Sequence, residues 1–225
     1  MSVLQAAWQW LTDSANWSGG GGIPTRLLEH VRYSVLALLF AAAVAIPLGL
    51  VTGHTGRGGF LAVNLANAAR ALPTLGLLVL VVLATSVGLT PVLVALVALA
   101  IPPILVNVYE GIRTVDADLK DAARGMGMTG WGVLIRLELP VAMPLILLGL
   151  RTAAIQIVAT ATVAAYVGIG GLGRFIFEGQ RLQDSGMVAG GSLLVVLLAL
   201  LVSLLFLALR RAIVPAGVRR RTITN

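Results

Sequence analysis

The chain has 225 residues, of which 58% are hydrophobic and 11% are charged, and its mean hydropathy is +0.98. Soluble domains are about 45–50% apolar and about 25% charged, so the composition excludes a sizeable soluble domain and predicts one integral membrane domain. The absence of cysteine excludes disulfides, thiol catalysis and cysteine-ligated metals. The net charge of +7 comes from basic residues between and after the apolar segments, which is typical of membrane topology and not of nucleic-acid binding.

Residues 1–26 are predicted to form an external N-terminal segment. No basic stretch precedes the short apolar run 3–11, so a signal peptide is not expected. The glycine run 19–22 is predicted to be a flexible linker. The tryptophans of this segment are suited to the membrane interface: Trp8, Trp10 and Trp17.

Five apolar segments are long enough to cross a bilayer as helices, since a span needs about 20 mostly apolar residues. They lie at about 27–51, 60–87, 92–109, 139–167 and 187–209. The sequence therefore predicts an all-α transmembrane domain over 27–209 and a basic tail over 210–225. Pro47 and Pro73 are expected to bend their helices, and the third segment contains Pro102 and Pro103.

The interval 110–138 is predicted to be a helix–turn–helix between two spans. Asp118 is expected to cap its first helix, Gly125 to end that helix in a left-handed turn, and Thr129 to cap the second helix. Gly127 is expected to allow a close backbone approach or a positive φ. Apolar residues from Trp131 onward recur at helical spacing. Such a shape suits the docking of a soluble partner.

Charge predicts the orientation of the chain, because five spans place its two ends on opposite sides. Most basic residues fall in the interval 110–138 and in the tail. They are Arg113, Lys120, Arg124, Arg136, Arg210, Arg211, Arg219, Arg220 and Arg221. The positive-inside rule therefore places both regions in the cytoplasm and the N-terminus outside a cell membrane.

The same interval carries a motif. Asp121-Ala122-Ala123 is followed by three residues and Gly127, and nine further residues lead to Leu137-Glu138-Leu139-Pro140. This pattern resembles the cytoplasmic loop of ABC importer permeases, which have Glu and Ile where this chain has Asp121 and Leu137. The resemblance implies that seven residues couple the chain to an ATPase: Asp121, Ala122, Ala123, Gly127, Leu137, Leu139 and Pro140.

Three further segments narrow the family. They are 71–75 (ALPTL), 149–153 (GLRTA) and 161–165 (ATVAA), the last followed by a glycine-rich stretch. Together with the loop motif, they resemble permeases of quaternary-ammonium osmoprotectant importers, which take up glycine betaine, carnitine, choline or proline betaine. The resemblance covers about residues 25–210.

The resemblance implies a small MetI-like type I ABC importer permease that works by alternating access. It implies as partners two cytoplasmic ATPase subunits that hold ATP and Mg²⁺, a second permease chain (the same or related) and an extracytoplasmic binding protein that delivers substrate to external loops including 168–186. Membrane lipid surrounds such a chain, and no nucleic acid, enzymatic role or cofactor of its own is expected. Two alternatives stay open: an ABC permease for another small solute such as an amino acid, and a membrane channel or structural protein without ATP coupling.

Polar residues inside the spans have two interpretations. They either border the translocation path, or they hold helices together while the arginines extend toward the cytoplasm. The residues are Asn64, Asn67, Arg70, Thr74, Arg151, Gln156 and Thr160. Aromatic residues are scattered along the spans, so we expect no aromatic cage in this chain. In the resembling family the cage belongs to the binding protein.

Three other chemistries are not expected. The stretch 168–173 matches GxGxxG but follows a membrane span instead of a strand, so it does not predict a dinucleotide site. His30 and His54 lack metal-ligand spacing. The sequence contains no P-loop, so the energy for transport is expected to come from a partner.

Overall fold

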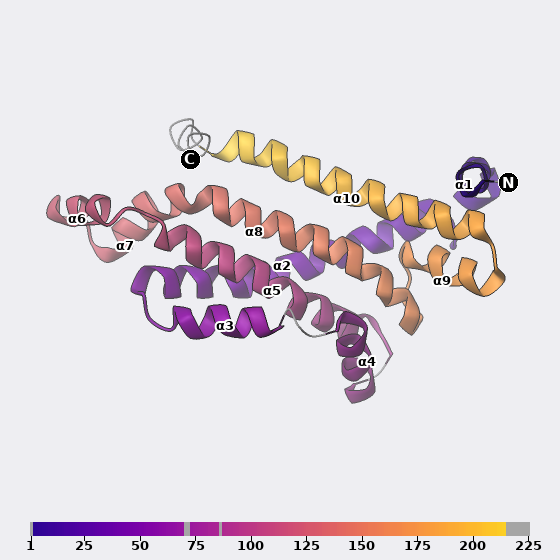
Figure 1. The fold of residues 1–225 in the computed structure, drawn as a ribbon, viewed down its shortest axis with the longest axis horizontal. Helices are drawn as coiled ribbons and strands as arrows, with labels where there is room; N and C mark the ends of the chain where they lie inside the picture. Colours follow the sequence, from indigo (N-terminus) through magenta and orange to yellow (C-terminus); the bar gives the residue numbers. More distant parts are fainter. Residues whose placement is uncertain (1, 70–72, 86, 215–225) are drawn as a thin grey trace. The chain divides into compact units, whose positions relative to one another are not determined.

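The structure is a computed structural model that describes residues 2–69, 73–85 and 87–214. Within these residues every regular element is helical (Figure 1). The elements are α1 (Val3–Thr12), the 3-10 turn η1 (Ser14–Trp17), α2 (Ile23–Thr55), α3 (Gly59–Ala69), α4 (Thr74–Ala84), α5 (Leu89–Arg113), α6 (Ala117–Gly125), α7 (Gly130–Val133), the π-helical turn η2 (Leu134–Glu138), α8 (Leu139–Thr160), the 3-10 segment η3 (Ala161–Val167), α9 (Gly173–Leu182) and α10 (Ser185–Ile213).

The predicted all-helical membrane fold is confirmed. The number of long spanning helices differs from the five predicted. Among the residues that the structure describes, four helical segments are long and apolar enough to cross a membrane. They are Ile23–Thr55, Leu89–Arg113, Gly130–Val167 and Ser185–Ile213. The span predicted over 60–87 is instead formed as two shorter apolar helices, α3 and α4. Pro73 is the N-cap of α4, and a proline disfavours helical geometry at the residue before it.

The described residues group into two compact units, and the long helices contribute to both. Unit 1 consists of Met1–Phe40, Leu72–Ala100 and Ala154–Val202. Unit 2 consists of Ala41–Ala71, Ile101–Ala153 and Ser203–Asn225.

In unit 2, glycines allow three long helices to pack closely. A Cβ atom added at Gly49 of α2 would lie 2.7 Å from the Val108 side chain of α5. A Cβ atom at Gly149 of α8 would lie 2.7 Å from Asn107, also on α5. Because such distances are too short for real atoms, α2, α5 and α8 pack at separations that only a glycine permits, as is common between membrane helices.

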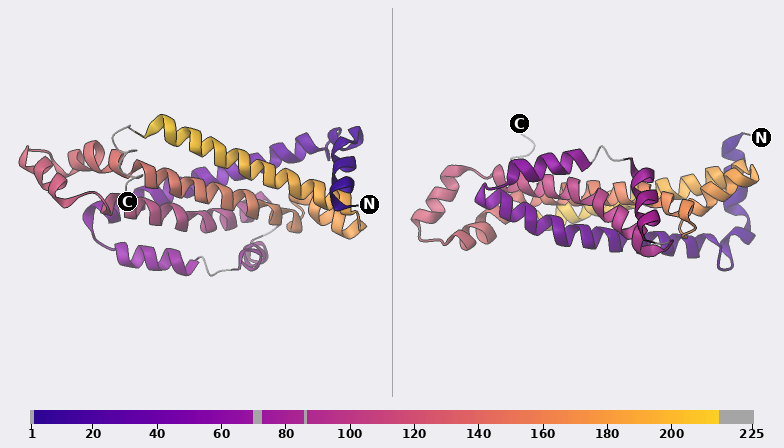
Figure 2. Two further views of the ribbon diagram at one scale, coloured as in Figure 1. Left: turned by 45° about the horizontal axis from the view of Figure 1, so that its top comes forward. Right: turned by 90° about the horizontal axis from the view of Figure 1, so that it is seen from below.

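In unit 1, α1 and α9 pack near the first turns of α10 (Figure 2). The rings of Trp10 and Phe175 meet edge to face at 4.9 Å between centroids, a favoured arrangement for aromatic pairs. Phe175 forms a buried cluster with Ile23 and Leu172. Residue Trp10 therefore packs against protein, whereas Trp8 remains largely exposed.

Candidate functional site

The 110–138 interval forms the predicted helix–turn–helix, α6 and α7, beyond the C-terminal end of α5 in unit 2 (Figure 1). Asp116, and not Asp118, caps α6, because its side chain accepts a hydrogen bond from the Asp118 N–H (2.9 Å). Thr129 caps α7 as predicted, since its hydroxyl oxygen accepts from the Gly132 N–H (3.2 Å). The predicted cap of the first helix was therefore wrong, because Asp116 caps it in place of Asp118. The predicted Thr129 cap of the second helix is confirmed.

The turn between α6 and α7 depends on Gly127 and not on Gly125. Gly125 is the last residue of α6, whereas Gly127 has a φ of +84°. A side chain with a Cβ costs about 1–2 kcal/mol in the left-handed region. No atom lies within 4 Å of the position that a Cβ of Gly127 would take, so one side of this turn is open.

A π-helical turn joins α7 to α8. Over Leu134–Glu138 the backbone widens, and the Leu139 N–H donates to the Leu134 carbonyl, five residues back. Pro140 follows at once and has no N–H to donate to the carbonyl four residues before it. The Leu-Pro of the motif therefore lies where the helix leaves α geometry, and such turns are frequent at functional sites.

Glu138, the last residue of the π turn, is the centre of a buried ionic network. Its side chain is 1% exposed. The Lys120 ammonium of α6 lies 3.0 Å from Glu138 Oε1, and His54 Nδ1 at the end of α2 lies 2.5 Å from Oε2. A carboxylate only accepts, so His54 Nδ1 carries the proton. We call His54, Lys120 and Glu138 the Glu138 network.

Lys120 adds a second link. Its Nζ donates to the Ile112 carbonyl near the end of α5 (3.1 Å), where a cation also complements the helix dipole. The Glu138 network therefore joins α2, α6 and the start of α8, and Lys120 extends it to α5. Within unit 2, polar contacts at the base of the helix–turn–helix hold it to the ends of α2 and α5.

The outer face of the helix–turn–helix is open and carries large exposed apolar side chains. Met126 is 75% exposed and Trp131 is 70% exposed. Both line a shallow cavity of about 660 Å³ together with Gly127, Ile135 and Arg136. Large exposed apolar side chains grouped around an open turn are typical of a protein contact surface.

The motif residues differ in their surroundings. Asp121 pairs with Arg124 at 3.4 Å, with both side chains more than half exposed. Ala122 is exposed and Ala123 is buried. The remaining motif positions are exposed at Gly127 and partly buried at Leu137, Leu139 and Pro140.

Comparison with known proteins decides the family. The model of the family described as "Binding-protein-dependent transport system inner membrane component" matches residues 45–217. The chain belongs to this family. It is 33% identical over 202 residues to the glycine betaine/carnitine/choline transport system permease protein OpuCB of Bacillus subtilis, covering 90% of this chain and 93% of that one. It is 34% identical over 203 residues to the choline transport system permease protein OpuBB of the same organism, covering 90% and 94%.

The fold has a solved counterpart. A chain in an inward-facing structure of the MetNI methionine ABC transporter superposes with a TM-score of 0.75. It is 23% identical to this chain, and the match covers 84% of this chain and 95% of the other. The chain is therefore a membrane permease with the type I ABC importer fold, as the sequence predicted.

Those polar residues predicted inside the permease spans that the structure describes fall in both units. In unit 1, Thr74 and Thr160 both line a small void, whose volume of about 10 Å³ is at the lower limit for one water. Gln156 lies nearby in the chain and is partly buried. In unit 2, Asn64 donates to its own helix at the Phe60 carbonyl, and Asn67 is exposed. Arg70 lies outside the described residues.

Arg151 has a partner that the sequence did not indicate. Its guanidinium donates to the Ser203 hydroxyl oxygen at 2.6 Å, which joins α8 to α10 within unit 2. This geometry favours the interpretation of Arg151 as a contact between helices.

The glycine-rich stretch 168–173 is held by the start of α2. The Gly171 N–H donates to Glu29 Oε2 (2.8 Å), and the Leu172 N–H donates to His30 Nδ1 (3.3 Å). Since Nδ1 accepts, the proton of the neutral His30 ring is on Nε2, which donates to the Val158 carbonyl (3.0 Å). His30 is fully buried. It therefore joins the stretch to α8.

Sequence reasoning did not find these polar contacts. The Glu138 network joins positions 84 residues apart, and the contacts of the start of α2 join positions 142 residues apart. One local signal was available for Glu138, a single carboxylate between Leu137 and Leu139 beside a proline. Such a residue is either unpaired and costly or paired with a buried cation.

Proposed function

We propose that the chain is the permease subunit of an ATP-driven importer for quaternary-ammonium osmoprotectants such as glycine betaine, carnitine and choline. The substrate class rests on one observation, that relatives named for these compounds match about 90% of this chain at 33–34% identity. The match extends over nearly the whole of each relative. We therefore propose the full transport role of those proteins for this chain.

The 110–138 interval is proposed as the coupling loop. Its open apolar face around Gly127 and Trp131 suits a groove on an ATPase subunit, where the missing Cβ allows close approach. The Glu138 network would then transmit displacement of α6 and α7 to α2 and α8. A loop joined to the spans by flexible backbone alone would lose part of this displacement.

The remaining components follow from this assignment. ATP and Mg²⁺ would be held by two partner ATPases in the cytoplasm, on the same side as the coupling loop and the tail. The N-terminus would be external, as the distribution of basic residues predicts. An extracytoplasmic binding protein would deliver substrate to the 168–186 loop. A second permease chain, the same or related, would complete the pathway. Thr74, Gln156 and Thr160 in unit 1 are proposed to border it, with Asn64, Asn67 and Arg70 as further candidates.

Uptake tests the substrate class. Cells with and without this chain are given labelled glycine betaine, carnitine, choline and a set of amino acids after an osmotic upshift. Loss of uptake of one or more of the first three compounds in the deleted cells is expected. Loss of amino-acid uptake alone would overturn the substrate assignment and favour the alternative of a permease for another small solute.

A glycine pair tests the coupling loop. Gly127→Asp is expected to abolish uptake and ATPase association, while the protein still inserts in the membrane. Gly58→Asp is the matched control, because Gly58 also has a positive φ (+71°) and open space around its Cβ position but lies outside the loop. Equal uptake by the two variants would contradict the docking role.

A further inference from the structure

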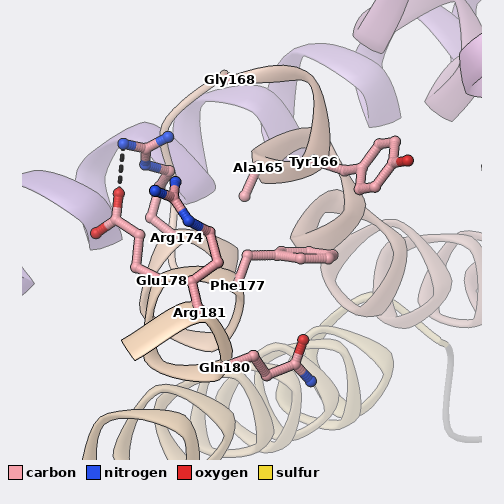
Figure 3. Close-up of a pocket in the computed structure, with 8 residues that line it drawn as sticks. All are labelled: Ala165, Tyr166, Gly168, Arg174, Phe177, Glu178, Gln180 and Arg181. Atoms are coloured by element: carbon pink, nitrogen blue, oxygen red, sulfur yellow. Dashed lines mark ion pairs between the residues drawn. The ribbon is translucent and has the colours of Figure 1, made fainter. Parts of the chain in front are cut away.

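The 168–186 loop contains a pocket that the proposed mechanism does not use. It lies in unit 1 between η3 and α9, and its volume is about 570 Å³, within the roughly 300–1,000 Å³ of small-molecule sites. Eight residues line it (Figure 3): Ala165, Tyr166, Gly168, Arg174, Phe177, Glu178, Gln180 and Arg181. The wall is therefore both aromatic and charged.

The frame of this pocket is fixed. η3 ends at Gly168, whose φ of +81° lets the chain reverse toward α9. The next residues are held by Glu29 and His30, through the hydrogen bonds to the Gly171 and Leu172 N–H groups. Leu172 directly precedes α9 and is fully buried. The helix that carries the pocket's charged side chains is thus anchored to buried structure at its start.

The charged side of the pocket has one uncompensated cation. Arg174 and Glu178 form an ion pair one turn apart on α9. Arg181 lines the same pocket and forms no ion pair with any described residue. The three charges sum to +1. A carboxylate entering the pocket would therefore be attracted, and a ligand with only a positive charge would be opposed.

The aromatic side lies opposite. The rings of Tyr166 and Phe177 have centroids 6.0 Å apart at an angle of 60°, and Figure 3 shows both pointing away from the arginines. An aromatic face attracts a quaternary ammonium group by cation–π interaction. We expected no aromatic cage in this chain because the aromatic residues of the spans are scattered. The sequence did not indicate that Phe177 of α9 lies beside Tyr166, at the end of the fourth predicted span.

We propose that this pocket is a subsite for zwitterions that carry a trimethylammonium group at one end and a carboxylate at the other, such as glycine betaine and carnitine. The ammonium would contact Phe177 and Tyr166, and the carboxylate would contact Arg181. Phe177 and Arg181 are four residues apart on α9, so both side chains leave the same side of the helix, and both line the pocket. The proposal rests on the proposed function. It adds that this pocket would prefer glycine betaine over choline, because choline lacks the carboxylate.

The test measures binding directly in the complete permease–ATPase assembly, in nanodiscs without the binding protein. Saturation-transfer NMR follows the N-methyl protons of glycine betaine and of choline. Phe177→Ala is expected to weaken glycine betaine binding about two- to five-fold, the size of one exposed cation–π contact, and Phe177→Tyr to restore it. Arg181→Gln is expected to remove the preference for glycine betaine over choline, and Arg181→Lys to keep it.

Two controls match these variants in chemistry but lie in unit 2. Phe60→Ala removes an exposed phenylalanine, and Arg57→Gln removes an exposed arginine. Both are expected to bind like the wild type. Glycine betaine binding that is unchanged in Phe177→Ala and Arg181→Gln would overturn the subsite, even where the wild-type protein supports uptake. Absence of uptake of every quaternary-ammonium compound by the wild type would instead overturn the proposed function, and the subsite with it.

Discussion

Glu138→Gln tests whether the coupling loop is held by the buried network. The amide keeps the shape of the side chain but removes the charge that Lys120 and His54 face. Removing one partner of a buried ion pair costs about 3–5 kcal/mol. Lys120 and His54 are 17% and 20% exposed, so water can solvate them in part, and we expect a loss of about 2–3 kcal/mol.

The loss is measured by thermal unfolding of the purified protein, followed by tryptophan fluorescence. For a chain of this size, about 2–3 kcal/mol corresponds to a fall in Tm of roughly 5–10 °C. Asp121→Asn is the control, because its ion pair with Arg124 is more than half exposed and such pairs contribute about 0–1 kcal/mol. A double-mutant cycle of Glu138→Gln with Lys120→Met should give a coupling energy of about 1 kcal/mol or more.

Two outcomes would refute this reasoning. A Tm for Glu138→Gln within a degree of the control would show that the carboxylate is not stabilised by its neighbours. Additive effects of Glu138→Gln and Lys120→Met would show that the two groups do not interact.

In the coupled transporter, a loosened loop should also raise the number of ATP molecules hydrolysed per substrate imported.

Three further predictions concern other contacts. Trp131→Ala should reduce the amount of ATPase that copurifies with the permease, whereas Trp8→Ala, at a similarly exposed tryptophan in α1, should not. His30→Ala should increase amide hydrogen exchange in the 168–172 stretch, because two hydrogen bonds of the ring are lost, and unchanged exchange would contradict the anchoring role. Gly49→Leu should lower the Tm by several degrees or prevent insertion, since its Cβ would overlap Val108, and wild-type stability would show that α2 and α5 separate readily.

Much of the fold could be predicted because the bilayer restricts the choice of structure. The length of each apolar run predicted α2, α5, α8 and α10, since only a helix satisfies its own backbone in lipid. The second span was the exception. Hydropathy averages over a window and does not register that Pro73 begins a new helix, α4.

The candidate site was predicted only where its geometry is local. The Thr129 cap depends on a residue three positions away and was found. A left-handed turn was expected at Gly125, and a close approach or a positive φ at Gly127. Of the two, only Gly127 has a positive φ, and the sequence could not decide between them because either glycine satisfies the same pattern. Pairing of Glu138 with His54, and of Arg151 with Ser203, joins helices that are distant in the chain. No periodicity in one segment specifies which residue of another segment will face it.

The two clusters of polar contacts have one element in common, helix α2. Near its start, Glu29 and His30 hold the backbone beside the pocket of the 168–186 loop. At its end, His54 holds Glu138 at the base of the coupling loop. Buried polar groups are costly unless satisfied, so a helix needed only to anchor the chain in lipid would not require them. The first long helix of this permease is therefore better understood as a support of both the proposed coupling loop and the 168–186 loop, each through side chains of its own.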